Sequence, residues 1–403
     1  MTVRPAWLEL VERLPVTAGR RALVLGDAEA HVCHELAGAG WDVSCCPDFQ
    51  RGRGPSEHVD ARFERVADLV ASSEELDVVV ATDGWRRLRE TNRAEAVGEL
   101  LEWVRRNARV AVVEAPRQYV APDLHDLGPF ATLDLLGRFR FLAEVPDDDA
   151  ALAPRTPVVT ASDRYLLADG AWIEAGDAER LDADPPGGPL RPVRTFRVPH
   201  GRIVKVECTS EDYFERTQLL GEASFLGDVD ERVRAELGLP RLVSLVRGRA
   251  VTTLIREDLA AGPPSTVDDR LAAVVDLAAR YAAHGLFHND VRPWNLLWDG
   301  GRARLIDFTE TSGHDDDVRD LPQVLALAGT LAAIATDEIG WGDPFHTDVL
   351  DLATRTGLLE RWPLERQLRD PWLALPDRRD RIVARSGMSA EEILRGVLEA
   401  TGE

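Results

Sequence analysis

The sequence predicts two folded parts, an α/β domain with a parallel sheet in the N-terminal half and an α+β domain in the C-terminal half. Three observations predict this division. Short apolar strands alternate with helical patterns up to about Val145, a Pro/Gly-rich stretch follows at 182–192, and a β-hairpin then leads into mostly helical sequence. Alternating strands and helices are typical of βαβ units, and Pro/Gly clusters mark connections. A chain of 403 residues is long enough for two or three domains.

The N-terminal half carries four apolar segments with the length and composition of strands, separated by stretches with helical periodicity. Regular alternation of this kind predicts parallel strands with helices covering the sheet. We therefore expect residues 1–150 to form one Rossmann-like domain. The expected strands are 22–25, 41–45, 77–81 and 109–114, and the expected helices include 30–39 and 93–107.

The C-terminal half begins after a connector that we place at 151–192, where strand-like pieces precede the segment DADPPGGPLRP. The alternating sequence RTFRVPHGRIVKV predicts a β-hairpin that turns at Pro199-His200-Gly201. Mostly helical sequence follows, with one strand–turn–strand pattern at 296–306. We expect a smaller lobe at 193–260 and a larger, mainly helical lobe at 261–403.

The composition indicates a folded protein that has neither nucleic acid nor anionic membrane surfaces as general partners. The chain has 48 basic and 70 acidic residues and a net charge of −22, which repels nucleic acid and anionic membrane surfaces. Its longest apolar run, 324–336, is shorter than the roughly 20 residues that span a bilayer, and its first residues lack the apolar core of a secretory signal. Four cysteines without metal-binding spacing predict reduced thiols. We expect a cytoplasmic protein with neither a transmembrane segment nor a nucleic-acid partner.

Lysine is nearly absent from the sequence. Of the 48 basic residues, 47 are arginine and one, Lys205, is lysine. Lys205 lies in the apolar segment RIVKV, where a strand is expected. An ammonium is a compact point charge that a broad guanidinium fork does not replace. The retained lysine therefore indicates a site that requires an ammonium.

A second group of polar residues lies in the segment HNDVRPWNLLWDGGRARLIDFT, residues 288–309. Phosphoryl transfer from ATP needs a carboxylate that orients the attacking hydroxyl, oxygen ligands for Mg²⁺ and a cation for the phosphates. Asp290 can supply the carboxylate, and Asn295 offers an amide oxygen. A glycine turn then returns the chain through RARLID and places Asp307 at a strand end as a second, charged ligand. This order predicts phosphotransfer that depends on ATP and Mg²⁺.

The segment resembles the catalytic core of the protein kinase-like superfamily, in which H-x-D-x-x-x-x-N is followed by D-F-G. His288, Asp290, Asn295 and Asp307 match that pattern in order and spacing. The resemblance implies a bilobal α+β fold, with Asp290 as the catalytic carboxylate and Asn295 and Asp307 as metal ligands. It also implies that Lys205 binds the α- and β-phosphates of ATP.

The same resemblance implies further contributors to the site. Glu222 lies in a helical stretch after the lysine and matches the glutamate that pairs with it, although Glu215 and Glu231 are alternatives. Arg292 matches a cation that reaches the γ-phosphate, and a surface arginine is the competing interpretation. The stretch 252–259 is positioned to form the hinge that binds adenine through its backbone.

Several positions depart from the pattern of regulated protein kinases. The glycine-rich loop is reduced to Pro199-His200-Gly201, Asn289 stands where an arginine is expected, and Thr309 replaces the glycine of D-F-G. No A-P-E-like segment follows Asp307. These departures favour a kinase of small molecules or glycans over an activation-loop protein kinase. The residues for metal and proton chemistry are all present, which argues against a pseudokinase.

The segment 22–48 resembles the first motif of class I S-adenosylmethionine methyltransferases, a strand followed by a glycine-rich turn, a helix and a second strand. The resemblance implies that Gly26, Glu29, Asp48 and Asp83 lie at an S-adenosylmethionine site. Alanines occupy the other two glycine positions of the turn, and their methyl groups would crowd the cofactor. A scaffold that has lost the cofactor, a working methyltransferase and a different Rossmann-like domain all remain open.

The order of the two halves resembles the bifunctional methyltransferase–kinase family. That family includes bacterial O-antigen chain terminators, which phosphorylate and then methylate a terminal sugar. The terminators carry a C-terminal coiled coil, whereas this sequence shows no sustained heptads. The resemblance implies ATP and Mg²⁺ as cofactors and a sugar, glycan or other small-molecule hydroxyl as acceptor. A bifunctional kinase–methyltransferase and a non-catalytic nucleotide-binding scaffold are the alternative functions.

Overall fold

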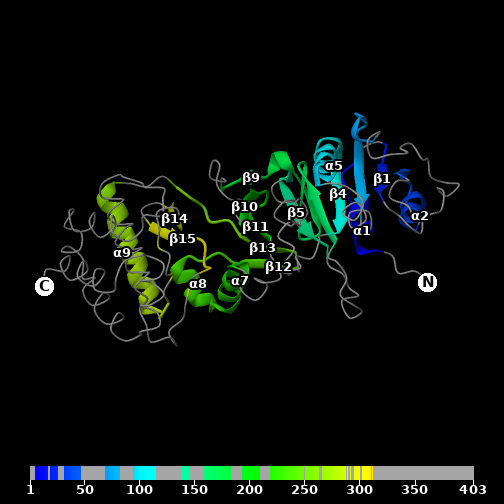
Figure 1. Cartoon of the computed structure of the whole chain (residues 1–403). Coiled ribbons are helices and arrows are strands. Elements are labelled where there is room, and N and C mark those ends of the chain that lie inside the picture. Colours follow the sequence, from blue (N-terminus) through cyan, green and yellow to red (C-terminus); the bar gives the residue numbers. More distant parts are fainter. Residues whose placement is uncertain are drawn as a thin grey trace, which may run out of the picture. The chain divides into compact units, whose positions relative to one another are not determined.

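The structure is a computed structural model of the whole chain (Figure 1). It divides into two compact units. The first unit comprises residues 1–219 and 242–258, and the second comprises 220–241 and 259–403. The residues that the structure describes are 5–16, 19–25, 31–46, 69–81, 94–114, 138–145, 158–182, 193–208, 218–248, 250–262, 266–286, 288, 291, 295–299, 302–309 and 311.

The first unit contains the parallel sheet that the sequence predicts. Its strand order is β2-β1-β3-β4-β6-β5, and β6 runs antiparallel to both of its neighbours. The strands are β1 (Arg21–Leu25), β2 (Asp42–Cys46), β3 (Leu76–Ala81), β4 (Ala108–Glu114), β5 (Phe141–Glu144) and β6 (Val158–Ser162). The expected helices are confirmed as α2 (His31–Gly38) and α5 (Ala94–Asn107), and α1 (Ala6–Glu12) adds a further helix.

Both faces of this sheet are covered, which explains why its strands are almost continuously apolar. Every residue of β3 is buried, and successive residues point to opposite faces. Val78 and Val80 belong to a core with side chains of α1 and α2, whereas Val79 and Ala81 belong to a core with side chains of α5. The α/β class predicted for this half is confirmed.

A five-stranded antiparallel sheet also belongs to the first unit, with the order β12-β13-β11-β10-β9. The predicted hairpin is confirmed, and its turn has left-handed backbone at His200 (φ 65°) and Gly201 (φ 64°). The strands are β9 (Glu179–Arg180), β10 (Val193–Val198), β11 (Arg202–Cys208), β12 (Leu242–Arg247) and β13 (Val251–Glu257). A short hairpin of β7 (Tyr165–Ala168) and β8 (Ala171–Glu174), followed by the 3-10 turn η3 (Ala175–Asp177), precedes this sheet.

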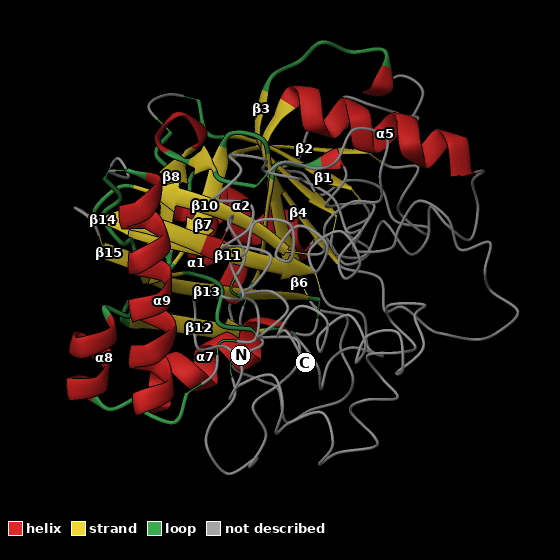
Figure 2. Ribbon diagram, turned by 90° about the vertical axis from the view of Figure 1, so that its left-hand side faces the viewer, coloured by secondary structure: helices red, strands yellow, loops and turns green. Residues whose placement is uncertain are grey.

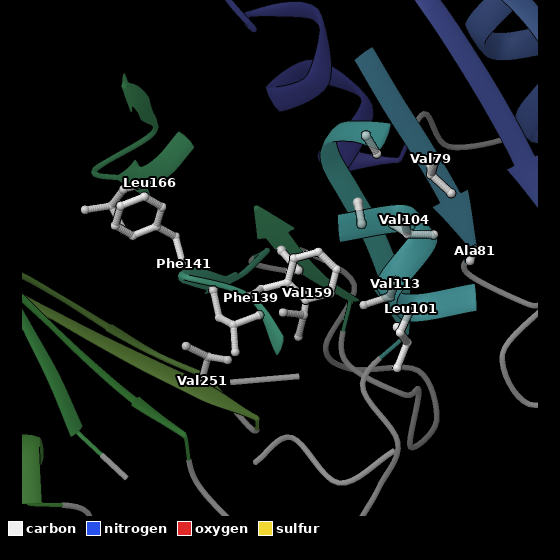
Figure 3. Close-up of a cluster of buried hydrophobic side chains, with 14 of the residues drawn as sticks. Val79, Ala81, Leu101, Val104, Val113, Phe139, Phe141, Val159, Leu166 and Val251 are labelled. Carbon is white, nitrogen blue, oxygen red and sulfur yellow. The ribbon is translucent and has the colours of Figure 1, made fainter. Parts of the chain in front are cut away.

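One apolar core joins the two sheets. Phe141 of β5 packs against Phe196 of β10, with 5.0 Å between the ring centroids, and Val204 and Ile255 belong to the same core. Figure 3 shows Phe141 among the buried side chains of this cluster, with Val251 of β13 below it. The five-stranded sheet is therefore packed on the six-stranded sheet, and the predicted connector 151–192 contributes a strand to each of them, β9 and β6.

Polar contacts reinforce this packing. The buried guanidinium of Arg194 on β10 donates hydrogen bonds to the carbonyl oxygens of Phe139 (2.8 Å) and Arg140 (3.2 Å). The carboxylate of Glu144 on β5 accepts hydrogen bonds from the backbone N–H groups of Ala250 (2.6 Å) and Val251 (3.0 Å). The division into functional domains near residues 150, 192 and 260 stays a prediction.

The second unit contains the helices and the small hairpin of the C-terminal half. Helix α7 (Gln218–Asp228) begins in the first unit and continues into the second. The other elements are α8 (Glu231–Leu237), α9 (Val267–Ala283), β14 (Leu296–Asp299) and β15 (Arg302–Leu305). Helix α9 lies against β15 and against α8 (Figure 2). The strand–turn–strand predicted near 296–306 is confirmed.

Helix α8 has clear start and stop signals. Asp230 accepts a hydrogen bond from the backbone N–H of Arg232 at its start, and Gly238 ends the helix with a left-handed φ of 67°. The buried guanidinium of Arg234 donates to the carbonyl oxygen of Leu226 on α7 at 2.7 Å, which fixes α8 against α7. None of the helices in the described ranges is long and apolar enough to cross a membrane.

Candidate functional site

Lys205 lies near the middle of β11, the central strand of the five-stranded sheet. Its neighbours across the sheet are Thr195 on β10 and Leu254 on β13, and its side chain is buried. Val204 and Val206 belong to the core shared with the N-terminal sheet, so the alternation of the strand directs Lys205 to the opposite face. An ammonium at this depth requires anionic or hydrogen-bonding groups around it.

Glu207 follows on the same face of β11 and caps the start of α7. Its carboxylate accepts hydrogen bonds from the backbone N–H groups of Gln218 (3.1 Å) and Leu219 (3.2 Å). The first N–H groups of a helix lack partners within the helix and carry partial positive charge, which favours a carboxylate there. Burial raises the pKa of Glu207, against the lowering effects of these two amides and of the Lys205 charge. The strand that carries Lys205 is thereby tied to the first turn of α7.

Glu222 lies one turn further along α7 and has no exposed surface. A carboxylate at this depth in a helix requires partners. The alternative Glu231 lies at the start of α8, where its exposed carboxylate pairs with the guanidinium groups of Arg234 and Arg241. The other alternative, Glu215, lies outside the described residues. Of the candidates that fall in the described ranges, Glu222 is the buried one.

The β14–β15 hairpin brings Asn295 and Asp307 to the same end. Asn295 directly precedes β14 and is buried, and its carbonyl oxygen accepts a hydrogen bond from the backbone N–H of Ile306 at 2.9 Å. This bond continues the ladder beyond the paired residues Leu296 and Leu305. Because Asp307 follows Ile306 directly, the side-chain amide of Asn295 and the carboxylate of Asp307 extend from neighbouring positions of the backbone.

Asp307 has a left-handed backbone conformation, with a φ of 66°. Few residues other than glycine adopt this conformation, although aspartate tolerates it better than most. Backbone strain of this kind is concentrated at functional sites. The Asp307 carboxylate also accepts a hydrogen bond from the hydroxyl of Thr309, with 2.7 Å between Oγ1 and Oδ1. Both the backbone and the carboxylate of Asp307 are therefore held in defined conformations.

A row of aromatic side chains fixes the segment that follows Asp307. Phe225 of α7 stacks on Phe308 with 5.4 Å between centroids, and the ring of His288 meets Phe308 at its edge at 5.5 Å. Tyr281 of α9 packs beside His288 at 6.4 Å. His288 and Phe308 have no exposed surface. The row joins α7, α9 and the Asp307 segment into one packed group.

Several residues predicted for the site lie outside the described residues. Of the short stretch 289–294, the structure describes Val291, which is buried. The predicted catalytic pair, Asp290 and Arg292, is therefore not placed. The predicted S-adenosylmethionine residues are Gly26, Glu29, Asp48 and Asp83, and they too lie outside the described ranges.

The predicted metal ligands suit Mg²⁺ by their chemistry. No group of three or more His, Cys, Asp or Glu side chains in the described part of the chain could hold a metal ion by itself. The predicted set instead combines one amide oxygen, from Asn295, with one carboxylate, from Asp307. Mg²⁺ binds oxygen ligands, takes few of them from the protein and uses substrate phosphates and water for the rest. The two residues fit that requirement.

The expectation that 252–259 forms an adenine-binding hinge is wrong for residues 252–256. These residues belong to β13, which is paired with β11 on one side and with β12 on the other. Their backbone N–H and C=O groups are used in the two ladders and are not available to a base. Immediately after β13, the backbone N–H of Asp258 donates to the carbonyl oxygen of Gly201 at 2.9 Å.

The structure adds three residues that the motifs did not indicate. Glu207 caps α7, Thr309 binds the Asp307 carboxylate, and Gly221 lets α7 approach the backbone of Thr309, because an added Cβ would lie 3.1 Å from that carbonyl oxygen. A signal was present for Glu207, since an acid two residues after Lys205 shares its face of an otherwise apolar strand. Gly221 and Thr309 act through packing and turn geometry, which the spacing of residues does not reveal.

Comparison with solved structures finds chains with the same fold, among them three structures of one protein. The medium-resolution structure of the bifunctional kinase-methyltransferase WbdD has 18% sequence identity and a TM-score of 0.52, and covers 95% of this chain and 93% of that chain. The structure of WbdD with its C-terminal bundle ordered has 18% identity and a TM-score of 0.57, over 98% and 90%. The co-crystal structure of WbdD and the kinase inhibitor LY294002 has 18% identity and a TM-score of 0.54, over 86% and 82%.

No family model and no curated protein sequence matches the chain. The likeness to WbdD therefore concerns architecture, and it extends over both halves of the chain. The chain has the fold of a bifunctional kinase-methyltransferase. The predicted resemblance is confirmed at the level of the fold.

Proposed function

We propose that the chain is an ATP-dependent phosphotransferase that moves the γ-phosphate of ATP to a hydroxyl of a sugar, a glycan or another small molecule. The observation that carries this proposal is the end of the β14–β15 hairpin, where Asn295 and Asp307 lie at neighbouring positions and Asp307 has a left-handed backbone. A hairpin does not need a strained acid at its end for stability. Residues adopt strained backbone conformations of this kind mainly at functional sites.

Each residue of the site has a separate task in the proposed reaction. Asp290 accepts a hydrogen bond from the acceptor hydroxyl and orients its oxygen for in-line attack on the γ-phosphorus. Asn295 and Asp307 hold Mg²⁺ through their side-chain oxygens. When bound, Mg²⁺ neutralises charge on the phosphate oxygens. Arg292 contributes a second cation at the γ-phosphate.

Lys205 binds the α- and β-phosphates, and Glu222 orients its ammonium. The burial of both side chains supports these roles, since a buried lysine and a buried glutamate are each stable only with partners. The exposed, arginine-paired carboxylate of Glu231 does not suit the role.

Labelled ATP provides the test. The purified chain is incubated with ATP labelled at the γ-phosphate and with extracts of glycans and metabolites, and products are identified by mass spectrometry. We expect a labelled acceptor with the wild type and none above background with Asp290→Asn or Asp307→Asn. Equal background labelling by all three proteins would contradict the proposal and would favour a non-catalytic nucleotide-binding scaffold.

The acceptor class follows from the departures noted in the sequence. Thr309 replaces the glycine that regulated protein kinases carry, and no A-P-E-like segment follows. A kinase whose acceptor is a small-molecule or glycan hydroxyl binds no peptide and therefore needs no activation segment. Phosphorylation of a protein substrate in the same extracts, without a labelled small molecule or glycan, would overturn this part of the proposal.

A second candidate function is methyl transfer by the N-terminal half. It is favoured by the parallel sheet β2-β1-β3-β4 and by a fold shared with a kinase-methyltransferase over both halves. Gly26, Glu29, Asp48 and Asp83 would form the S-adenosylmethionine site. Isothermal titration with S-adenosylmethionine tests this candidate, and the absence of measurable binding would remove it without affecting the kinase proposal.

A further inference from the structure

The hydroxyl of Thr309 contacts the one carboxylate that the proposed reaction assigns to the metal. Its Oγ1 donates a hydrogen bond to Oδ1 of Asp307, and the two atoms are 2.7 Å apart. Thr309 stands two residues after Asp307, where the kinase pattern has a glycine without a side chain. The departure from that pattern therefore introduces a hydrogen-bond donor directly at Asp307.

The backbone that carries this hydroxyl is itself held from two sides. The carbonyl oxygen of Thr309 lies against Gly221 of α7, so closely that an added Cβ would be 3.1 Å away. The preceding residue, Phe308, is fully buried between Phe225 and His288. Threonine is also stiff about χ1 because two heavy atoms branch at its Cβ. The donor thus starts from a fixed backbone and has little rotational freedom.

This hydrogen bond restricts the rotation of the Asp307 carboxylate and uses only a small part of its hydrogen-bonding capacity. An ionised carboxylate has two oxygens with about four lone-pair directions, and Thr309 uses one of them. The Asp307 side chain has two rotatable bonds, and rotation about either of them moves its oxygens relative to a ligand position. With Oδ1 held, Oδ2 and the remaining lone pair of Oδ1 point in set directions.

We propose that Thr309 is a positioning residue that fixes the Asp307 carboxylate in the orientation in which it binds a divalent cation. The inference rests on the proposed function, because it takes Asp307 to be a metal ligand. Groups that hydrogen-bond to a metal ligand orient it, and their loss costs roughly 10–100-fold in metal affinity or activity. A glycine at this position would have no side chain to donate a hydrogen bond to Asp307.

Binding of Mn²⁺ gives a readout that does not depend on turnover. Free Mn²⁺ is counted by electron paramagnetic resonance during titration of the whole chain in the presence of a non-hydrolysable ATP analogue. We expect Thr309→Val, which removes the donor at nearly constant volume, to weaken Mn²⁺ binding by about 10-fold. Thr309→Ser, which keeps a hydroxyl, should remain close to the wild type.

Thr311 provides the matched control in the same segment. The buried Oγ1 of Thr311 has no hydrogen-bond partner within the described residues, and its backbone N–H donates to the carbonyl oxygen of Phe308 at 3.2 Å. Thr311→Val is therefore the same substitution without the contact to Asp307, and it should leave Mn²⁺ binding unchanged. Circular dichroism of each variant checks its fold, and if Thr309→Val does not fold, Thr309→Ala takes its place.

The outcomes separate this inference from the function on which it rests. Wild-type Mn²⁺ affinity in Thr309→Val, together with lost affinity in Asp307→Asn, would overturn the role of Thr309 and leave the metal site intact. Wild-type Mn²⁺ affinity in Asp307→Asn would contradict the metal site itself. An equal loss in Thr309→Val and Thr311→Val would show that packing, and not the hydroxyl, is responsible, which also overturns the inference.

Discussion

The single lysine of the chain gives the sharpest test at the scale of one residue. Lys205→Arg keeps the positive charge but places a broad guanidinium fork at a buried strand position that holds a compact ammonium. We expect the rate of phosphate transfer to fall roughly 100-fold, the loss seen when one charge-stabilising donor is removed from a transition state. The rate is measured with γ-labelled ATP.

Arg202→Lys is the control for this exchange. Arg202 begins the same strand, β11, and is partly exposed, so the reverse substitution there should leave the rate unchanged. If Lys205→Arg transfers phosphate as fast as the wild type, the retention of this lysine has no connection with the nucleotide.

The placement of two candidate site residues could be predicted from the sequence, because it follows from the pairing of a strand–turn–strand. Asn295 and Asp307 flank a strand–turn–strand whose pairing returns them to the same end, and the structure places them there. The role of Thr309 could not be predicted in this way. Its hydrogen bond depends on the left-handed backbone of Asp307, and residue types alone do not specify that conformation.

At the scale of elements, Glu207 makes the attachment of α7 to β11 sensitive to pH. Burial raises its pKa in the folded state above the ordinary value of 4.5. As the pH rises above 4.5, the unfolded chain releases this proton before the folded chain does. Over that interval the folded state binds more protons, so the contribution of Glu207 to the free energy of unfolding falls with rising pH.

Glu207→Gln removes this titration and keeps one oxygen that can accept from the start of α7. We expect the free energy of unfolding of the wild type to fall, relative to the variant, as the pH rises above 4.5, and the difference to become constant once Glu207 is ionised in both states. Urea unfolding at a series of pH values measures it. Parallel stability profiles for the two proteins would contradict the buried, proton-binding state of Glu207.

Two helical glycines offer a paired test of how closely α7 packs on the Asp307 segment. Alanine stabilises a helix interior by about 1 kcal/mol relative to glycine. At Gly98 in α5 an added Cβ meets only the end of the flexible Arg138 side chain, at 3.4 Å. At Gly221 in α7 it meets the backbone carbonyl oxygen of Thr309 at 3.1 Å, and this atom cannot rotate away.

We therefore expect Gly98→Ala to raise the free energy of unfolding by up to about 1 kcal/mol. Gly221→Ala should show no such gain and should also weaken Mn²⁺ binding, because the displaced Thr309 carries the hydroxyl that binds Asp307. Urea unfolding and the Mn²⁺ titration measure the two effects. Equal stabilisation by both substitutions would show that α7 is free to shift.

The hinge shows where sequence reasoning about elements was wrong. In the stretch 252–259, residues 252–256 pair with a strand on either side. Their sequence, TTLIR, has the β-branched and apolar residues of a buried strand. Spacing along the chain does not show where a ladder ends, and only backbone beyond the ladder is available to a ligand.

At the scale of the molecule, Phe141 tests whether the two sheets of the first unit are stable only together. Its ring is buried and packs on Phe196 of the neighbouring sheet. We expect Phe141→Ala to lower the free energy of unfolding by about 3–5 kcal/mol, the usual cost of deleting a buried aromatic ring. Denaturant unfolding followed by the fluorescence of tryptophan in the first unit measures it.

Affinity for the ATP analogue should fall in the same variant, because the sheet destabilised by the lost ring carries Lys205. A variant that loses stability in the N-terminal sheet and binds the nucleotide analogue with wild-type affinity would show that the two sheets respond independently.

The overall classes of structure were predictable and the way the halves join was not. Alternating strands and helices predicted the parallel sheet, whereas β9, which precedes the Pro/Gly-rich stretch at 182–192, already belongs to the five-stranded sheet. That stretch does not separate two cores, because Phe196 and Val204 beyond it pack with Phe141 before it. Amphipathic patterns show that a strand has an apolar face but do not name the surface that covers it.

The shared core has a consequence for how a chain of this fold could lose methyl transfer. Substitutions in a cofactor turn can abolish methyl transfer while the sheet behind that turn continues to shield Phe196, Val204 and Ile255 from water. Deleting the N-terminal half would instead expose those side chains on the sheet that holds the lysine. An N-terminal half without methyl transfer would therefore be kept for structural reasons.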